Sequence, residues 1–238
     1  MTLLEQAARD NAEWCEAVAR SHGIRSRFTS DAWLAASRTP PTFPDAVTLR
    51  HSAGPEVLSG IDASDGCSVK DSFAALDLTA DGFRVLLDAR WIYRAPARER
   101  PGPSGSREPG VSAAVGVEGL DWSVLEPHAL SAWAALHGAD AVFRPTLLAE
   151  PGIVFLRADV DGSLAAGAVL SHTGAVVGIS NIVTAGAVAA ESVWPGVVEQ
   201  ASRLFPGMAL VGYESGADLM APLGAGFTEL GDLRVWGR

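Results

Sequence analysis

The spacing of apolar residues changes several times in the last quarter of the chain. An apolar stripe at helical spacing ends at Pro206-Gly207, and the run 208–213 that follows is short and continuous, as in a buried strand. The next helix must be short, because Pro222 lacks an N–H and Gly226-Phe227 follows closely. We therefore predict a helix, a strand, a short helix and a closing pair of strands. The stripe consists of Val193, Trp194, Val197, Val198, Ala201, Leu204 and Phe205.

Shorter apolar runs separated by turn residues precede this segment. The runs 153–157, 165–170 and 175–183 are divided by Asp161-Gly162 and Thr173-Gly174. Such pairs between apolar runs are typical of hairpin turns, so the pattern predicts an antiparallel meander of three strands.

The first half of the chain opens with a clear helix signal. Thr2 and Glu5 have the spacing of a capping box, an apolar stripe follows them, and Gly23 ends the pattern. The remaining predicted elements are helices over 3–22, 69–78 and 127–136 and strands over 45–50, 85–93 and 115–125.

Residues 95–113 differ in character from everything around them. They are rich in proline, glycine and charged residues, and such a composition buries too little apolar surface to order itself. The sequence therefore predicts an αβ domain over 1–95, a linker over 96–113 and a second domain over 114–238.

Two segments of the chain resemble each other. When Gly82–Arg94 is laid on Gly226–Arg238, six of the thirteen positions are identical. A strand and a helical pattern precede each segment. The first domain is therefore either a partial copy of the second or carries a similar corner by chance.

Composition excludes several classes of function. The net charge of −10 argues against nucleic-acid binding, which depends on Lys and Arg contacts to phosphates. No apolar run reaches the length of a membrane span, and the polar start of the chain leads us to expect no signal peptide. Cys15 and Cys67 have no metal-type spacing, so we expect free thiols, no metal and a cytoplasmic protein. Lys70 is the single lysine, which we interpret as coding bias.

The predicted order of elements over 193–238 resembles the carboxyl half of the GNAT superfamily, the acyl-CoA-dependent N-acyltransferases. The resemblance implies an α/β (α+β) fold with a mixed, mostly antiparallel sheet flanked by helices, preceded here by a smaller αβ domain that is a candidate partial GNAT copy. It also implies acetyl-CoA as the acyl donor and a primary amine, on a small molecule or a peptide, as the acceptor.

The resemblance assigns the donor site to one strand and the loop after it. The strand backbone at Ile179, Asn181, Ile182 and Val183 would hold the pantetheine arm. The pyrophosphate would meet backbone N–H groups where the next helix begins. The residues matching that loop are Gly186, Ala187 and Ala189.

Two positions depart from the family pattern. The loop 184–191 contains no basic residue and carries Glu191, whose charge opposes a phosphate. Pro222 stands where the family has a tyrosine that protonates the leaving thiolate. Tyr213 and Glu214, at the end of the preceding strand, are the nearest catalytic candidates.

Two functions are therefore compatible with the sequence. The first is an acetyl-CoA-dependent N-acetyltransferase acting on a primary amine. The alternative is a catalytically silent GNAT-like domain with a binding or regulatory role, which the two departures favour. The sequence leaves the acceptor, the acyl chain and the oligomeric state open, with a homodimer as one option.

Overall fold

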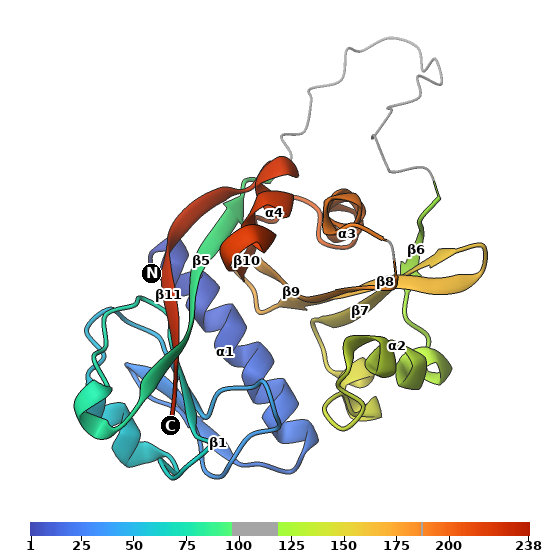
Figure 1. The fold of residues 1–238 in the computed structure, drawn as a ribbon. Helices are drawn as coiled ribbons and strands as arrows, with labels where there is room; N and C mark the ends of the chain where they lie inside the picture. The colour runs from blue at the N-terminus through green and yellow to red at the C-terminus, as the bar shows by residue number, and fades with distance from the viewer. Residues whose placement is uncertain (97–118, 187) are drawn as a thin grey trace.

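The computed structural model describes residues 1–96, 119–186 and 188–238, which form an eleven-stranded sheet with helices against it (Figure 1). The predicted linker, 96–113, lies outside the described residues apart from Pro96. The helices are α1 (Leu3–Ser21), α2 (Leu130–His137), α3 (Ala190–Leu204) and α4 (Met220–Gly224). The strands are β1 (Ser26–Phe28), β2 (Ala32–Ala35), β3 (Ala46–Thr48), β4 (Ser68–Asp71), β5 (Arg84–Arg94), β6 (Asp121–Val124), β7 (Ile153–Val160), β8 (Ser163–His172), β9 (Val177–Thr184), β10 (Leu210–Glu214) and β11 (Thr228–Gly237).

The strands are ordered β1-β2-β3-β4-β11-β5-β10-β9-β8-β7-β6. Among the described residues, β3 with β4 and β9 with β10 are the parallel pairs, and all other neighbours are antiparallel. The predicted fold class, a mixed and mostly antiparallel sheet flanked by helices, is confirmed. The segments predicted as two domains share this one sheet.

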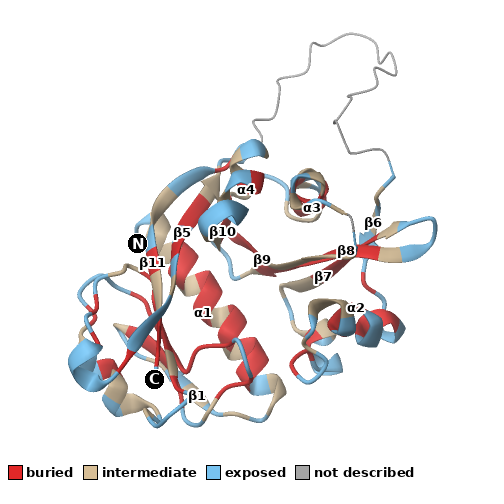
Figure 2. Ribbon diagram, viewed as in Figure 1, coloured by how far each residue is buried: buried red, intermediate tan, exposed pale blue. Residues whose placement is uncertain are grey.

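Helix α1 begins as its sequence predicts. The Glu5 N–H donates to Thr2 Oγ1 at 3.2 Å, and the Thr2 N–H donates to Glu5 Oε2 at 2.8 Å, which completes the capping box. Figure 2 shows buried residues along much of the helix. Trp14 and Val18 pack into a core shared by the first three strands and by α2. Helix α1 therefore joins the two halves of the molecule.

The predicted meander is confirmed by β7, β8 and β9. Asp161 and Gly162 both have positive φ, 49° and 76°, in the turn between β7 and β8. Alternate residues of β7 face opposite sides: Phe155 packs with α2 and Leu156 packs with α3. Helices α2 and α3 accordingly lie on opposite faces of these strands (Figure 1).

Two predicted elements are wrong. The segment 69–78 is not a helix: β4 ends at Asp71, whose carboxylate accepts the N–H groups of Phe73 and Leu76 at 3.2 and 2.7 Å and so holds a loop. The corner at Gly226-Phe227 opens one strand, β11, instead of a pair. Strand β5 of the first half fills the place beside it, between β11 and β10.

The pairing of β5 with β11 is symmetric about its centre. Ala89 faces Leu233 in the middle, and the register shifts by one residue at the same distance on either side. Arg90 forms an ion pair with Asp232, and Arg234 pairs with Asp88 at 2.7 Å. In the alignment of the two similar segments, Asp88 matches Asp232 and Arg90 matches Arg234. The two similar segments are therefore related by a two-fold axis through the centre of the β5–β11 pair.

Candidate functional site

Strands β9 and β10 pair for a short distance and then separate. They are in register at Val177 with Leu210 and at Gly178 with Val211, but no further pairs form although both strands continue. Gly212 lies where they part: a Cβ there would come within 2.9 Å of the Ile179 carbonyl oxygen. The backbone of β9 beyond this point therefore has no strand partner on the β10 side.

Strand β9 also carries a bulge at this place. Its pairing with β8 shifts between Ser180 and Val183, so two residues of β9 oppose one residue of β8. Asn181 is in the bulge with φ 52°, a conformation that asparagine tolerates better than most residues. Its amide nitrogen donates to Ser180 Oγ at 2.9 Å. The bulge turns this part of β9 toward the opening between the strands.

A cavity of about 280 Å³ lies at the opening. Of the residues that the sequence nominated, Ile179, Asn181, Ile182, Tyr213 and Glu214 all line it. The structure therefore brings the strand and the catalytic candidates together. Val183, Gly186 and Ala189 do not line this cavity, and Ala187 lies outside the described residues.

The Glu214 carboxylate, which lines the cavity, has a raised pKa. Burial at the end of β10 raises its pKa to about 7, and the nearby charge of Asp218 contributes in the same direction. A carboxylate with a pKa near neutral pH can take a proton from an amine and release it again, so Glu214 has the properties of a general base.

A buried lysine from the first half lies on the same cavity. The Lys70 ammonium donates to Asn11 Oδ1 at 2.9 Å and to Tyr213 Oη at 3.0 Å, and its nitrogen is 4.4 Å from the centre of the Tyr213 ring. Burial opposes the charged form, but the interactions with Tyr213 and Cys15 outweigh it and raise the pKa of Lys70. The cavity therefore contains a cation as well as a titrating carboxylate.

Helix α1 is fixed beside the opening by a second buried carboxylate. Asp10 accepts hydrogen bonds from Ser171 Oγ at 2.6 Å and from Thr173 Oγ1 at 3.0 Å, which ties the helix to the end of β8. A Cβ at position 178 would clash with Asp10, so glycine is required there. Burial raises the pKa of Asp10 to about 7.

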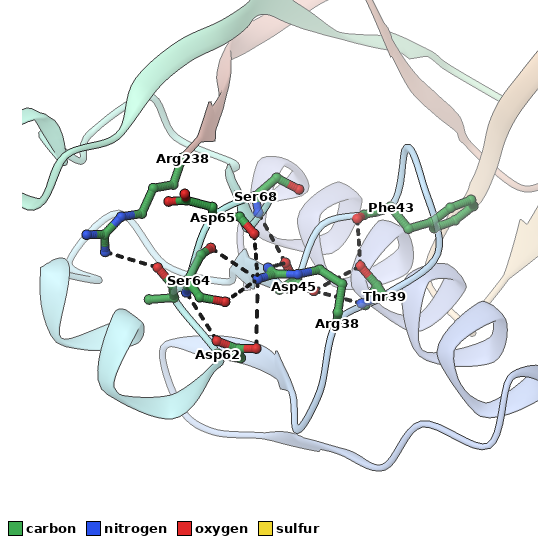
Figure 3. Close-up of polar contacts among 10 residues, drawn as sticks. Arg38, Thr39, Phe43, Asp45, Asp62, Ser64, Asp65, Ser68 and Arg238 are labelled. Atoms are coloured by element: carbon green, nitrogen blue, oxygen red, sulfur yellow. Dashed lines mark hydrogen bonds and ion pairs between the residues drawn. The ribbon is translucent and has the colours of Figure 1, made fainter.

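One wall of the cavity is the loop between β2 and β3. Asp45 accepts from Arg38 Nη1 at 2.6 Å and from the N–H groups of Thr39 and Ser68 at 2.8 and 3.1 Å. Thr39 Oγ1 donates to the carbonyl of Phe43 at 2.7 Å. Figure 3 shows this network at the base of the loop, with the Phe43 ring pointing away from it. The loop residues 42–44 line the cavity, so the network sets the position of that wall.

Replacing Asp45 by alanine should therefore destabilise the fold. The Asp45 side chain is 2% exposed, and its loss removes the acceptor of Arg38 Nη1 and of the Thr39 and Ser68 N–H groups. Arg38 Nη2 keeps its hydrogen bond to Ser64 Oγ at 3.0 Å. We expect the free energy of unfolding to fall by about 2–4 kcal/mol, less than for a fully buried pair because Arg38 is partly exposed. Urea unfolding measures this free energy.

Asp62→Ala is the control. Asp62 lies 3.9 Å from Arg38 but its side chain is 55% exposed, so we expect the free energy of unfolding to change by about 0–1 kcal/mol. Equal losses would contradict the account.

Comparison with known proteins finds no matching family model and no matching curated protein. Solved structures do match. A GCN5-related N-acetyltransferase from Kribbella flavida superposes with a TM-score of 0.60 at 15% identity, covering 97% of this chain and 95% of that one. A GCN5-related N-acetyltransferase-like protein from Streptococcus suis gives 0.52 at 13% identity, covering 98% and 97%.

The fold is that of the GNAT superfamily. Both matches extend over nearly the whole of this chain, so the fold they share includes the first half as well as the second. The sequence resemblance had rested on 193–238 and is confirmed as a likeness of fold.

The family resemblance in the sequence assigned the donor's phosphates to the start of α3. Within the described part of the chain, no side chain caps this helix at Ala189. The Ser192 N–H donates to the Ala189 carbonyl at 3.0 Å, so the N–H groups of Ala190 and Glu191 are the first-turn donors that could meet a ligand. Gly186 has φ 56°, a conformation that suits glycine. Glu191 is in the first turn and exposed, so its carboxylate can turn toward solvent.

The part of the cavity that the first half supplies was not predicted from the sequence. Asn11 and Trp14 of α1, the loop 42–44 and Lys70 of β4 all line it. A single lysine in 238 residues was the one signal that could have pointed there, and coding bias does not explain its buried position. His137 at the end of α2 also lines the cavity, and burial lowers its pKa.

In residues 1–96, 119–186 and 188–238, no group of three His, Cys, Asp or Glu side chains is placed to hold a metal ion. No helix within these ranges combines the length and apolar character needed to cross a bilayer.

Proposed function

We propose that the protein is an acyl-CoA-dependent N-acyltransferase that transfers an acyl group to a primary amine. The observation that carries the proposal is Glu214, a carboxylate with a pKa of about 7 at the end of β10, beyond the point where β9 and β10 separate. A GNAT fold alone does not require a titrating carboxylate there. The cavity beside it gives an acceptor a place to bind.

The proposed reaction is a direct transfer. The Glu214 carboxylate takes a proton from the acceptor ammonium, and the neutral amine attacks the thioester carbonyl carbon. A C–N bond forms, the C–S bond breaks, and the second amine proton leaves with solvent. The thiolate is protonated by solvent, since Pro222 carries no acid. The unpaired backbone of β9 at Ile179–Val183 would hold the pantetheine arm.

The acyl-CoA is a substrate of this reaction, and the chain offers two groups of contacts for it. Unpaired N–H and C=O groups of β9 suit the amides of pantetheine. The N–H groups of Ala190 and Glu191, at the start of α3, suit the pyrophosphate. The loop 184–191 adds no positive charge, so we expect weaker donor binding than a basic loop would give.

A silent binding domain is the second candidate. Pro222 in α4 and Glu191 in α3 favour it, because the first cannot donate a proton and the second opposes a phosphate. A silent domain would bind acyl-CoA or an amine without turnover. The two candidates therefore differ in one observable, which is thiol release.

Release of CoA thiol distinguishes them. Purified protein is incubated with acetyl-CoA and a panel of primary amines, and free thiol is followed with a disulfide reagent. We expect amine-dependent release above the rate of thioester hydrolysis, with the acetylated amine found by mass spectrometry. Release that no amine accelerates would contradict the transferase and leave the silent domain.

A further inference from the structure

The cavity beside the separated strands holds the Lys70 ammonium, which forms no ion pair with any carboxylate in the described part of the chain. Lys70 is 5% exposed, and its two hydrogen-bond partners, Asn11 Oδ1 and Tyr213 Oη, are an amide and a phenol oxygen rather than carboxylates. An ammonium has three N–H donors, so one remains for a ligand. Because the interactions with Tyr213 and Cys15 keep Lys70 in its charged form, a ligand carboxylate would gain a charge-assisted hydrogen bond from it.

The two charged groups of the cavity come from its two sides. Lys70 is on β4 of the first half and Glu214 is at the end of β10 of the second half. No ion pair joins them within the described residues, so each is free to meet a different part of a ligand. A base that accepts the proton of an amine and a cation that attracts a carboxylate together fit a molecule with both groups.

The rest of the lining indicates the size and polarity of that molecule. Trp14, Phe43, Pro44 and Ile182 give the cavity an apolar wall. Its volume of about 280 Å³ is at the lower limit of small-molecule sites, so it suits one amino acid rather than a peptide segment.

From this arrangement we propose that the acceptor is an amino acid with an apolar side chain, whose carboxylate binds Lys70 and whose amine faces Glu214. This inference rests on the proposed transferase function for the role of the amine. The carboxylate site itself is independent of it, because binding needs no turnover. It also gives the first half a function: without β4 and α1 the cavity would lack its cation.

Matched pairs of acceptors test the proposal. L-phenylalanine is compared with 2-phenylethylamine, and L-leucine with 3-methylbutylamine; each pair differs in the carboxylate. For the wild-type protein we expect kcat/KM to be about 10- to 100-fold higher for the acid, as a charged hydrogen bond to a buried cation implies. A preference for the decarboxylated amine, or none, would overturn the proposal.

Two substitutions separate recognition from a structural role of Lys70. Lys70→Met removes the charge and should bring the acid-to-amine ratio close to one. Asn11→Asp keeps the lysine but gives it an internal carboxylate at the distance of the present 2.9 Å contact, so the ratio should also fall. A lysine that only supports the fold would leave the Asn11→Asp ratio at the wild-type value. Arg50→Met, on an exposed arginine outside the cavity, is the control and should keep the preference.

Calorimetry without acyl-CoA separates this inference from the proposed function. We expect L-phenylalanine to bind the wild-type protein and to bind Lys70→Met about 10- to 100-fold more weakly. Binding that depends on Lys70 in a protein that never releases thiol would support the carboxylate site and contradict the transferase. Thiol release with amines but no binding of either amino acid would contradict the carboxylate site alone.

Discussion

Replacing Glu214 by glutamine is expected to lower kcat/KM for acyl transfer by about 10²- to 10⁴-fold, the range for loss of a general base. The pH profile should change with it. Because burial raises the pKa of Glu214 to about 7, the wild-type rate should rise with pH up to about 7 and then level off as the carboxylate ionises. Glutamine cannot ionise, so the variant should lose this limb. Rates between pH 5.5 and 9 measure both effects.

A neighbouring charge gives a finer test of the same assignment. Asp218 raises the pKa of Glu214, so Asp218→Asn should move the midpoint of the pH profile to lower pH while the plateau stays near the wild-type value. Glu199→Gln, on an exposed position of α3, is the matched control and should leave the profile unchanged. An unshifted profile in Asp218→Asn, or a Glu214→Gln enzyme of normal rate, would contradict the role of Glu214.

Cutting the chain between its halves should leave them bound to each other. Strand β5 pairs along its length with β11 and also with β10, and Trp91 and Ile92 are fully buried there. A protease site placed in 97–113 would break the covalent link and none of these contacts. We expect the cut fragments to co-elute in size-exclusion chromatography, and 114–238 expressed alone to be unfolded, because the edges of β10 and β11 would be unpaired.

Separation of the fragments would contradict the conclusion that the two halves share one sheet. If the fragments separate after cutting and 114–238 gives the dispersed amide spectrum of a folded domain, the halves are independent. Ile92→Asp provides the control, since a charge in the buried face of β5 should release the fragments from each other after cutting.

The local parts of the fold could be predicted from the sequence, and the exchange of strands could not. The α1 capping box and the meander depend on residues close together in the chain. The place of β5 depends on a partner more than a hundred residues away, and the sequence of a strand does not specify which strand it pairs with. The false helix at 69–78 has a different, local cause: the Asp71 carboxylate accepts the N–H groups of Phe73 and Leu76, which holds a loop in a segment whose apolar spacing is helical.

The candidate site was half predictable for the same reason. Tyr213, Glu214 and the strand 179–183 lie in the segment that carries the family resemblance. Lys70 and Asn11 come from the other half, and only the assembled sheet brings them to the cavity. The sequence shows that Lys70 is the single lysine, but nothing in the sequence indicates that it lies at a functional site.

The paired strands support the proposal that the first half is a partial copy of the second. Asp71 faces Arg234 on β11 as Glu214 faces Arg90 on β5, and the two arginines are equivalent in the similar segments. By the same register, Lys70 corresponds to Tyr213. In the first half the carboxylate holds a loop, whereas in the second it lines the cavity. We propose one active cleft, with the first half adapted to complete it.

Calorimetric titration with acetyl-CoA tests the central claim most directly, because every proposed step requires the donor to bind between β9 and β10. We expect saturable binding with a Kd of about 1–100 μM, weaker in Gly186→Pro, since proline cannot adopt the positive φ at the start of α3. Absence of binding to the wild-type protein at millimolar acetyl-CoA would contradict the account.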